Sequence, residues 1–310
     1  MAPIIRVQNV KKIYRVGKEK VVALDNINLD IEQGEICSIV GPSGSGKSTL
    51  LNQLAGLEKP NKGRVLIGKH NISEMSEKDL AIFRQQNLGF IFQSYNLLHQ
   101  LTAIENVALP LMFKGVGKRQ REKLARAELK KMGLGNRMTH RPTEMSGGQQ
   151  QRVGIARAFV GKPKIIFADE PTGNLDSKTT KQVLASMIKL AKEEGITFVM
   201  VTHEHDLAGC ADRIVTLKDG QIVKDERTDG SWYEKLEAEA ALEAEKAAQI
   251  KPENGPKGKK QGVAGNAAKI RTADKAAMAE KISQAIELQD EKPQKNGNSE
   301  EKGEQNNEKK

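Results

Sequence analysis

The segment that most restricts how this chain can fold is a glycine-rich loop near its N-terminal end. It follows Ile36–Val40, a short apolar run of the kind that forms a strand buried on both faces of a parallel sheet. A helical pattern is expected to follow the loop, from Lys47 to about Gly56. The loop fits the pattern G-x-x-x-x-G-K-[ST], and its residues are Gly41, Pro42, Ser43, Gly44, Ser45, Gly46, Lys47, Ser48 and Thr49.

This loop predicts binding of a magnesium nucleotide. Glycines let backbone N–H groups point at a phosphate chain, and the following helix adds its N-terminal partial positive charge. Lys47 would supply a point charge to the β- and γ-phosphates, and the Ser48 hydroxyl is the expected Mg²⁺ ligand. The alternative is a glycine-rich turn without a ligand. The position between a strand and a helix favours the phosphate-binding interpretation.

The rest of the first 230 residues predicts an α/β fold. Residues 165–168 and Thr197–Val201 are also apolar runs typical of buried parallel strands, and helical patterns start at Ser177 and near His205. The stretch 73–160 is more helical and polar, which indicates an inserted subdomain. Ligands of such sheets bind beyond the carboxyl ends of the strands, so the chemistry is expected where each strand ends.

The composition changes near residue 230. Residues 231–310 contain 15 Lys/Arg and 15 Asp/Glu, so the net charge of +10 lies entirely in the preceding part. Their only aromatic residues are Trp232 and Tyr233. Such a segment buries too little apolar surface to offset the entropy of ordering. We expect a polar extension at 229–310, disordered except for helix-favouring stretches at about 232–250 and 272–288.

Several classes of protein are disfavoured. No apolar run approaches the roughly 18 residues of a membrane span, and the first residues lack the features of a secretory signal. The two cysteines, Cys37 and Cys210, cannot form a disulfide scaffold, and their separation excludes a cysteine-based zinc site. These features predict a soluble cytoplasmic protein.

A second group of motifs indicates which class of phosphate-loop protein this chain resembles. Met145-Ser146-Gly147-Gly148-Gln149 precedes a helical pattern; alone, it could be only a helix start with Ser146 as the N-cap. The strand at 165–168 ends in Asp169 and Glu170, Asn174-Leu175-Asp176 follows, and His203 comes after the next strand. In this order and spacing, the motifs resemble those of the ATP-binding cassette (ABC) ATPases over residues 4–228.

The resemblance implies a fold and an activity. The fold would be a phosphate-loop ATPase with a mostly parallel sheet, N-terminal antiparallel strands and a helical subdomain at about 75–160. Asp169 would hold Mg²⁺ opposite Ser48, and Glu170 would polarise the water that attacks the γ-phosphate of ATP. Gln93 would sense the Mg²⁺ and that water, and His203 would contact the γ-phosphate. Taken alone, Glu170 could be a helix N-cap, and Gln93 would be unremarkable.

Further contacts with the nucleotide follow from the same resemblance. Tyr14 would stack on adenine, although an ordinary core tyrosine is the alternative. The SGGQ loop would complete the site of a second subunit, most simply in a head-to-tail homodimer that sandwiches two ATP molecules. The residues expected to contact nucleotide from this side are Ser146, Gly147, Gly148, Gln149 and Asp176.

Two departures from the common family pattern are present. Met145 replaces the usual leucine, which packing should tolerate, and Asn174-Leu175-Asp176 replaces Ala-Leu-Asp. Together with residues 92–98 and 101–107, the second departure resembles one subgroup. That subgroup contains the macrolide and antimicrobial-peptide exporters, the lipoprotein-release ATPase and the cell-division ATPase.

The expected function is therefore an ATP-hydrolysing subunit that drives a separate membrane permease docked near residues 93–98, at the cytoplasmic face of the membrane. The alternative is a module whose permease regulates an extracytoplasmic enzyme or sensor without transport. A third alternative, suggested only by the charge of +10, is an ABC protein that acts on DNA or the ribosome. Such proteins usually carry two cassettes or a long coiled coil between the phosphate loop and the SGGQ loop, whereas only 105 positions separate Gly41 from Ser146, so nucleic acid is not an expected partner. Residues 114–141 contain ten Lys/Arg against Glu122 and Glu128, which indicates either contact with anionic lipid or acidic loops, or a solvated helix face.

Overall fold

The computed structural model describes residues 3–231, 233–235 and 238 of the 310-residue chain. The chain divides into two units, Met1–Gly255 and Pro256–Lys310, and only the first contains described residues. Residues 231, 233–235 and 238 are helical. The predictions for the remainder of the extension, including the stretch at 272–288, lie outside the described residues.

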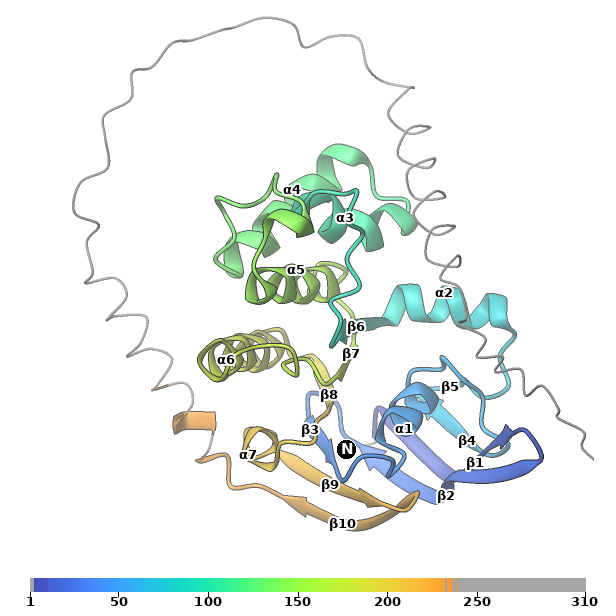
Figure 1. Cartoon of the computed structure of the whole chain (residues 1–310). Helices are drawn as coiled ribbons and strands as arrows, with labels where there is room; N and C mark the ends of the chain where they lie inside the picture. The colour runs from blue at the N-terminus through green and yellow to red at the C-terminus, as the bar shows by residue number, and fades with distance from the viewer. Residues whose placement is uncertain (1–2, 232, 236–237, 239–310) are drawn as a thin grey trace, which may run out of the picture. The chain divides into compact units, whose positions relative to one another are not determined.

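A six-stranded, mostly parallel sheet forms the centre of the first unit (Figure 1). Its strand order is β10-β9-β3-β8-β7-β6, and every pair is parallel except β9 with β10. The strands β3 and β8 are completely buried, as expected for apolar runs covered on both faces. The bounds are β3 Ile36–Val40, β6 Leu88–Phe92, β7 Ile165–Asp169, β8 Thr197–Val201, β9 Arg213–Lys218 and β10 Gln221–Arg227.

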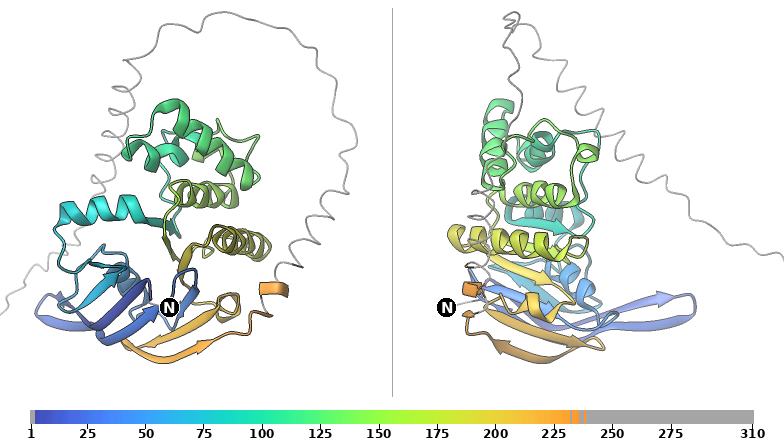
Figure 2. Two further views of the ribbon diagram at one scale, coloured as in Figure 1. Left: turned by 180° about the vertical axis from the view of Figure 1, so that it is seen from behind. Right: turned by 60° about the vertical axis from the view of Figure 1, so that its left-hand side comes forward.

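The second sheet is antiparallel, with the order β2-β1-β4-β5. Its strands are β1 Ile5–Val16, β2 Glu19–Ile31, β4 Lys62–Ile67 and β5 His70–Asn71. The hairpin of β1 and β2 extends beyond the rest of the sheet, as the right-hand view of Figure 2 shows. Apolar residues from both sheets and from the first helix pack into one continuous core, which supports the loop after β3.

Helices cover the parallel sheet and form a second core with its other face. Residues that favour helix ends stand at two of their termini: Thr102 and Glu105 form a capping box at the start of α3, and Gly195 ends α6 in the left-handed conformation. The helices are α1 Lys47–Leu54, α2 Glu77–Asn87, α3 Ala103–Phe113, α4 Lys118–Lys131, α5 Gly147–Phe159, α6 Ser177–Glu194 and α7 His205–Ala208, with a 3-10 turn at Pro142–Glu144.

The predicted α/β class with N-terminal antiparallel strands is confirmed. One feature differs from a purely helical insertion: β6 lies inside the stretch 73–160 but pairs in parallel with β7 and forms an edge of the main sheet. Cys37 and Cys210 are both free and buried, and burial raises the pKa of each thiol to about 12. Within the described part, no helix is long and apolar enough to cross a bilayer.

Candidate nucleotide-binding site

The topology brings the predicted motifs to one edge of the main sheet. In the paired register, Phe92 of β6 lies beside Asp169 of β7, and Asp169 lies beside Val201 of β8. Ile39 of β3 pairs with the same Val201. The residues that follow these strand ends are the phosphate loop, Gln93, Glu170 and His203. Parallel pairing therefore gathers segments that lie far apart in the sequence.

The phosphate loop is tightly enclosed at two glycines. A Cβ on Gly41 would lie 2.1 Å from the carbonyl oxygen of Leu217, and one on Gly46 would lie 2.4 Å from that of Ala23. Both glycines also have positive φ angles, +151° and +99°. A side chain at either position would displace backbone, so the loop path requires glycine and leaves its N–H groups accessible to a close ligand.

Lys47 lies over this loop. Its ammonium Nζ donates hydrogen bonds of 2.9 Å to the carbonyl oxygens of Gly41 and Pro42, and only 7% of the residue is exposed. The side chain is thereby held in place before a phosphate arrives. The glycine backbone, the helix N-terminus and the fixed cation together suit the phosphate chain of a nucleoside triphosphate.

A pair of oxygen ligands fits Mg²⁺. The hydroxyl Oγ of Ser48, on α1, donates to Oδ1 of Asp169 at 3.2 Å. Burial raises the pKa of Asp169; the hydrogen bond from Ser48 opposes this shift, while the charge of Glu170 adds to it. Cation binding would relieve the crowding of negative charge. The described residues contain no cluster of three or more His, Cys, Asp or Glu that could hold a metal. Beyond Ser48, Asp169 and the predicted Gln93, the ligands of a bound Mg²⁺ would be phosphate oxygens and water.

Glu170 and His203 form a contact beside this pair. Oε1 of Glu170 lies 3.2 Å from Nδ1 of His203. Glu170 has a φ of +42°, which is unusual for a residue with a side chain, and its N–H donates to the carbonyl of Val201. Strained backbone conformations of this kind cluster at active sites.

Gln93 is held against the loop that follows Glu170. Asn174 Nδ2 donates to the carbonyl oxygen of Gln93 at 2.9 Å, and a Cβ on Gly173 would lie 2.7 Å from Gln93 Nε2. Gly173 therefore leaves room for the glutamine side chain. The arrangement connects β6 to the acidic strand end, as the predicted role of Gln93 requires, although that role itself stays a prediction.

Tyr14 is fixed by a polar network that sequence reasoning did not include. Its hydroxyl donates to Oε2 of Glu58 at 2.7 Å, and Glu58 also binds Lys12 at 3.0 Å and Asn52 at 3.2 Å. The Lys12 ammonium lies 5.2 Å from the centre of the Tyr14 ring. Partial burial and the Glu58 carboxylate raise the pKa of Tyr14, so the hydroxyl remains a donor near neutral pH.

If Tyr14 stacks on adenine, removing the hydrogen bond between its hydroxyl and Glu58 should weaken binding of the adenine base but not of the phosphates. We expect Glu58→Ala and Tyr14→Phe each to raise the KM for ATP about tenfold with little change in kcat, because a charged hydrogen bond is lost away from the phosphates. Inhibition by inorganic tripolyphosphate, which has no base, should be unaffected. An unchanged KM, or an equal loss of tripolyphosphate binding, would show that Glu58 does not position this ring.

The SGGQ loop lines a different pocket. Ser146 caps α5: its Oγ accepts from the N–H of Gln149 at 3.4 Å, and Gln149 Oε1 accepts from the N–H of Ser146. The pocket has a volume of about 410 Å³ and is lined by the SGGQ loop and by parts of the 174–176 loop and α6, but by no residue of the phosphate loop. Asp176 caps α6 and borders this pocket. The structure thus separates the predicted nucleotide contacts into two groups.

Other side chains that support the site were also missed. Arg157 of α5 donates to the backbone carbonyls of Tyr95 and Asn96, both of which have positive φ, and Gln151 donates to the carbonyl of Pro171. These bonds connect the SGGQ helix to the segment after Gln93 and to the segment after Glu170. No motif marks them, although asparagine at position 96 suits a positive φ.

The fold and the site define a phosphate-loop nucleotide hydrolase with a helical insertion. The ABC transporter family matches residues 24–173. A Methanocaldococcus jannaschii protein, described as the uncharacterised ABC transporter ATP-binding protein MJ1508, is 54% identical over 220 residues, which are 71% of this chain and 98% of that protein. The macrolide export ATP-binding/permease protein MacB of Vibrio parahaemolyticus is 44% identical over 72% of this chain and 34% of MacB.

Solved structures agree with this comparison. The dimeric structure of MJ0796 of Methanocaldococcus jannaschii, described as a bacterial ABC transporter cassette, has 45% sequence identity and a TM-score of 0.69, and the match covers 73% of this chain and 99% of the cassette. A dimeric post-hydrolysis state of the same cassette, bound to ADP and Pi, gives a TM-score of 0.68. The chain belongs to the ABC transporter ATP-binding proteins. It is an ATPase that uses ATP and Mg²⁺.

Proposed function

We propose that two copies of this chain pair head to tail and hydrolyse ATP at their shared interfaces. One observation carries the proposal: the phosphate loop and the SGGQ pocket are separate surfaces of one copy, each with only a part of the predicted nucleotide contacts. A second copy, turned by a two-fold axis, supplies the missing half to both sites. The dimeric MJ0796 cassettes support this arrangement.

In such a pair, the residues have distinct tasks. Lys47 and the loop glycines bind the phosphates, Ser48 and Asp169 hold the Mg²⁺, and the cation supplies charge neutralisation when bound. Glu170 accepts a proton from the attacking water. The remaining contacts to the γ-phosphate, Mg²⁺ or base are assigned to Gln93, His203, Tyr14, Ser146, Gly147, Gly148, Gln149 and Asp176.

The pairing is tested by dilution. Specific ATPase activity should fall as the protein is diluted below the dissociation constant of the dimer, because a single copy has no complete site. Activity per molecule that is independent of concentration, together with a monomeric mass in the presence of ATP, would contradict the proposal.

A groove beside β6 supports attachment to a permease. It has a volume of about 400 Å³, and its lining is mainly apolar. Phe113, at the end of α3, is 59% exposed on it, and Leu57 is 46% exposed. Exposed apolar side chains of this size mark interaction surfaces. The groove also includes Phe92 and Asn96, which lie on either side of Gln93 in the sequence, so an occupant would lie next to the residue proposed to sense Mg²⁺ and the attacking water.

Phe113→Asp should therefore detach the chain from its permease without impairing ATP hydrolysis by the isolated dimer. Co-purification with the native permease is expected to fall at least tenfold, since a large exposed aromatic residue is lost from the contact. Val223→Asp is the matched control, because Val223 is 57% exposed on β10 at the opposite edge of the sheet. Equal recovery of both variants would argue against the groove as the docking site.

The function of such a complex is inferred from that of the related proteins. We infer a peripheral protein on the cytoplasmic face of the membrane that powers export of a small molecule or peptide, or release of lipoproteins, by a separate permease. The MacB protein, in which an ATP-binding part and a permease are joined, supports this inference. We assign the ATPase domain to residues 4–228, the helical subdomain to about 75–160, and the polar extension to 229–310.

A further inference from the structure

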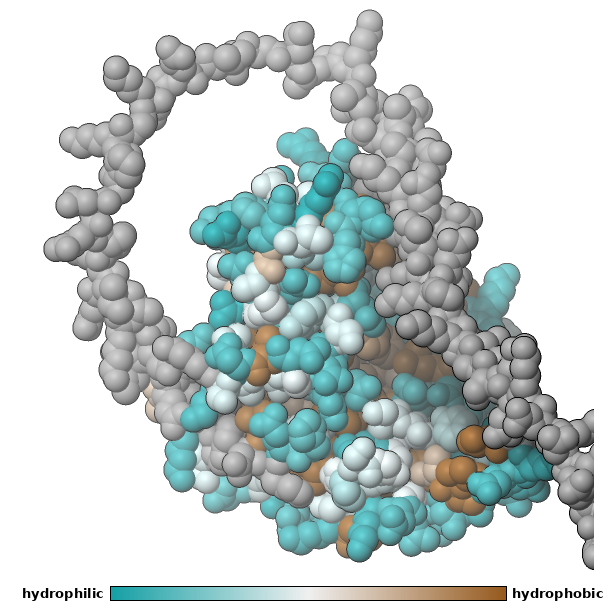
Figure 3. Space-filling view, viewed as in Figure 1, coloured by the Kyte–Doolittle hydropathy of each residue, from teal (hydrophilic) through white to brown (hydrophobic). Residues whose placement is uncertain are grey.

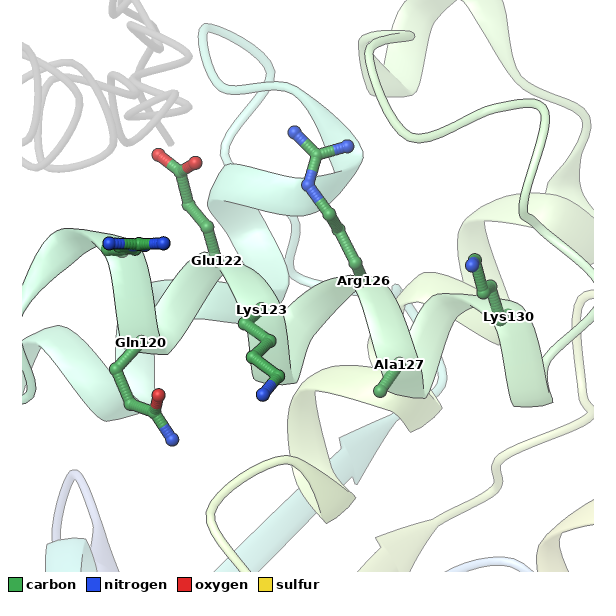
Figure 4. Close-up of a pocket in the computed structure, with 7 residues that line it drawn as sticks. Gln120, Glu122, Lys123, Arg126, Ala127 and Lys130 are labelled. Carbon is green, nitrogen blue, oxygen red and sulfur yellow. The ribbon is translucent and has the colours of Figure 1, made fainter.

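One face of α4 carries cations that the proposed function does not use. Arg119, Lys123, Arg126 and Lys130 recur at intervals of four, three and four residues, which places them along one side of the helix. All four are exposed. They border a shallow depression of about 810 Å³, shown in Figure 4, and we call these four residues the α4 cationic row. The depression is completed by Gln120, Glu122 and Ala127.

The cationic row is poorly neutralised within residues 3–231. The neighbouring Lys131 binds Glu128 at 3.0 Å and Glu194 at 2.7 Å, whereas no such ion pair joins the row to another of the described residues. Its one polar contact there is that of the Arg126 guanidinium with the sulfur of Met138, at 3.7 Å. Among the described residues that line the depression, Glu122 is the only acidic one. Hydrophilic side chains dominate the surface over α4 in Figure 3.

The four like charges of the row destabilise α4. Like charges three or four positions apart repel one another, whereas Glu–Lys pairs at the same spacing would stabilise the helix. An ordinary solvated helix face would mix the two signs. A row of one sign instead produces a positive potential that attracts anionic surfaces.

We propose that the α4 cationic row contacts anionic lipid headgroups of the membrane that holds the permease. The proposal rests on the proposed attachment to a permease: Phe113 and Lys114 line the docking groove, and α4 begins only four residues later. The row therefore starts beside the surface that faces the permease. From Arg119 to Lys130 it extends about 16 Å along the helix axis, which suits distributed lipid phosphates better than one small anion.

The test uses the purified full chain and vesicles without permease. We expect flotation with vesicles that contain phosphatidylglycerol, no binding to pure phosphatidylcholine, and weaker binding at high salt. Neutralising the row should weaken binding on the order of several-hundred-fold, about fivefold for each charge. The row variant combines Arg119→Gln, Lys123→Gln, Arg126→Gln and Lys130→Gln. The matched control combines Lys62→Gln, Lys69→Gln, Lys78→Gln and Lys164→Gln, four exposed positions outside α4.

The control and the row variant carry the same net charge. A difference in vesicle binding between them would therefore be due to the position of the charges. Equal binding by wild type and row variant, or an equal loss in the control, would overturn the proposal. A row variant that binds vesicles normally but no longer co-purifies with the permease would assign the row to an acidic protein surface and overturn it as well. Unchanged ATPase activity and melting temperature show that the variants are folded. Loss of vesicle binding with the permease contact intact leaves the proposed function standing.

Discussion

Replacing Glu170 with Gln is expected to reduce kcat by about 10²–10⁴-fold while ATP binding remains close to that of the wild type. The amide has nearly the same shape as the carboxylate but cannot accept the proton of the attacking water. Because Gln can adopt the same strained backbone at φ +42°, and because the contacts of Lys47 and Ser48 are not altered, the phosphates should still be held.

Blocked hydrolysis should also trap the dimer. Gel filtration of the Glu170→Gln variant with ATP is expected to show accumulation of a species of twice the monomer mass, and ADP should not support it. Glu204→Gln is the control, since Glu204 is an exposed acid that follows β8 by three residues and its side chain makes no cap hydrogen bond. Wild-type turnover in the Glu170 variant would exclude that residue as the base.

Ser146→Arg is expected to reduce turnover by at least 10²–10³-fold while each copy still binds ATP at its own phosphate loop. The hydroxyl that caps α5 uses an oxygen lone pair for the N–H of Gln149, so its own proton remains available to a phosphate in the pocket. Arginine removes this donor and fills the pocket. ATPase activity and ATP binding, measured on the same sample, distinguish a loss of turnover from a loss of nucleotide binding.

Mixing two inactive variants shows on which copy Ser146 acts. Lys47→Ala disables the phosphate loop but leaves the SGGQ loop intact, and Ser146→Arg does the reverse. In a head-to-tail pair of the two variants, one site is doubly defective and the other has both halves intact, so mixing should restore part of the activity. If Ser146 acted on nucleotide bound to its own copy, the mixture would remain as inactive as its components.

Much of the central fold could be predicted because its signals are local. The apolar run before Gly41 and the run before Asp169 are strands in the structure, and α1 starts at Lys47 as expected, although it ends at Leu54 rather than Gly56. The strand β6 was not predicted as part of the main sheet, because it lies inside a stretch whose sequence is mostly helical. Its five residues are specified by pairing with β7, a contact across more than seventy positions that no local pattern shows.

The site was predictable to the extent that its chemistry lies in continuous motifs. The phosphate loop, the SGGQ loop and the acidic strand end could each be predicted from a short stretch of sequence. The structure brings the phosphate loop and the acidic strand end to one edge of the main sheet, and the SGGQ loop lines a separate pocket. Glu58 and Arg157 were missed for a physical reason. Glu58 acts on Tyr14 across 44 positions, and Arg157 acts on Tyr95 across 62, through contacts that exist only after folding.

The short loop from Glu170 to Asp176 belongs to both surfaces of one copy: it starts at the contact with His203 and ends at the border of the SGGQ pocket. In the proposed pair, each such loop therefore borders two bound nucleotides, one on its own copy and one on the other. If these seven residues move after one cleavage, the environment of the second nucleotide changes as well, and the two catalytic cycles are then not independent of each other. Alternation between the sites would be a property of this shared connection rather than of either site alone.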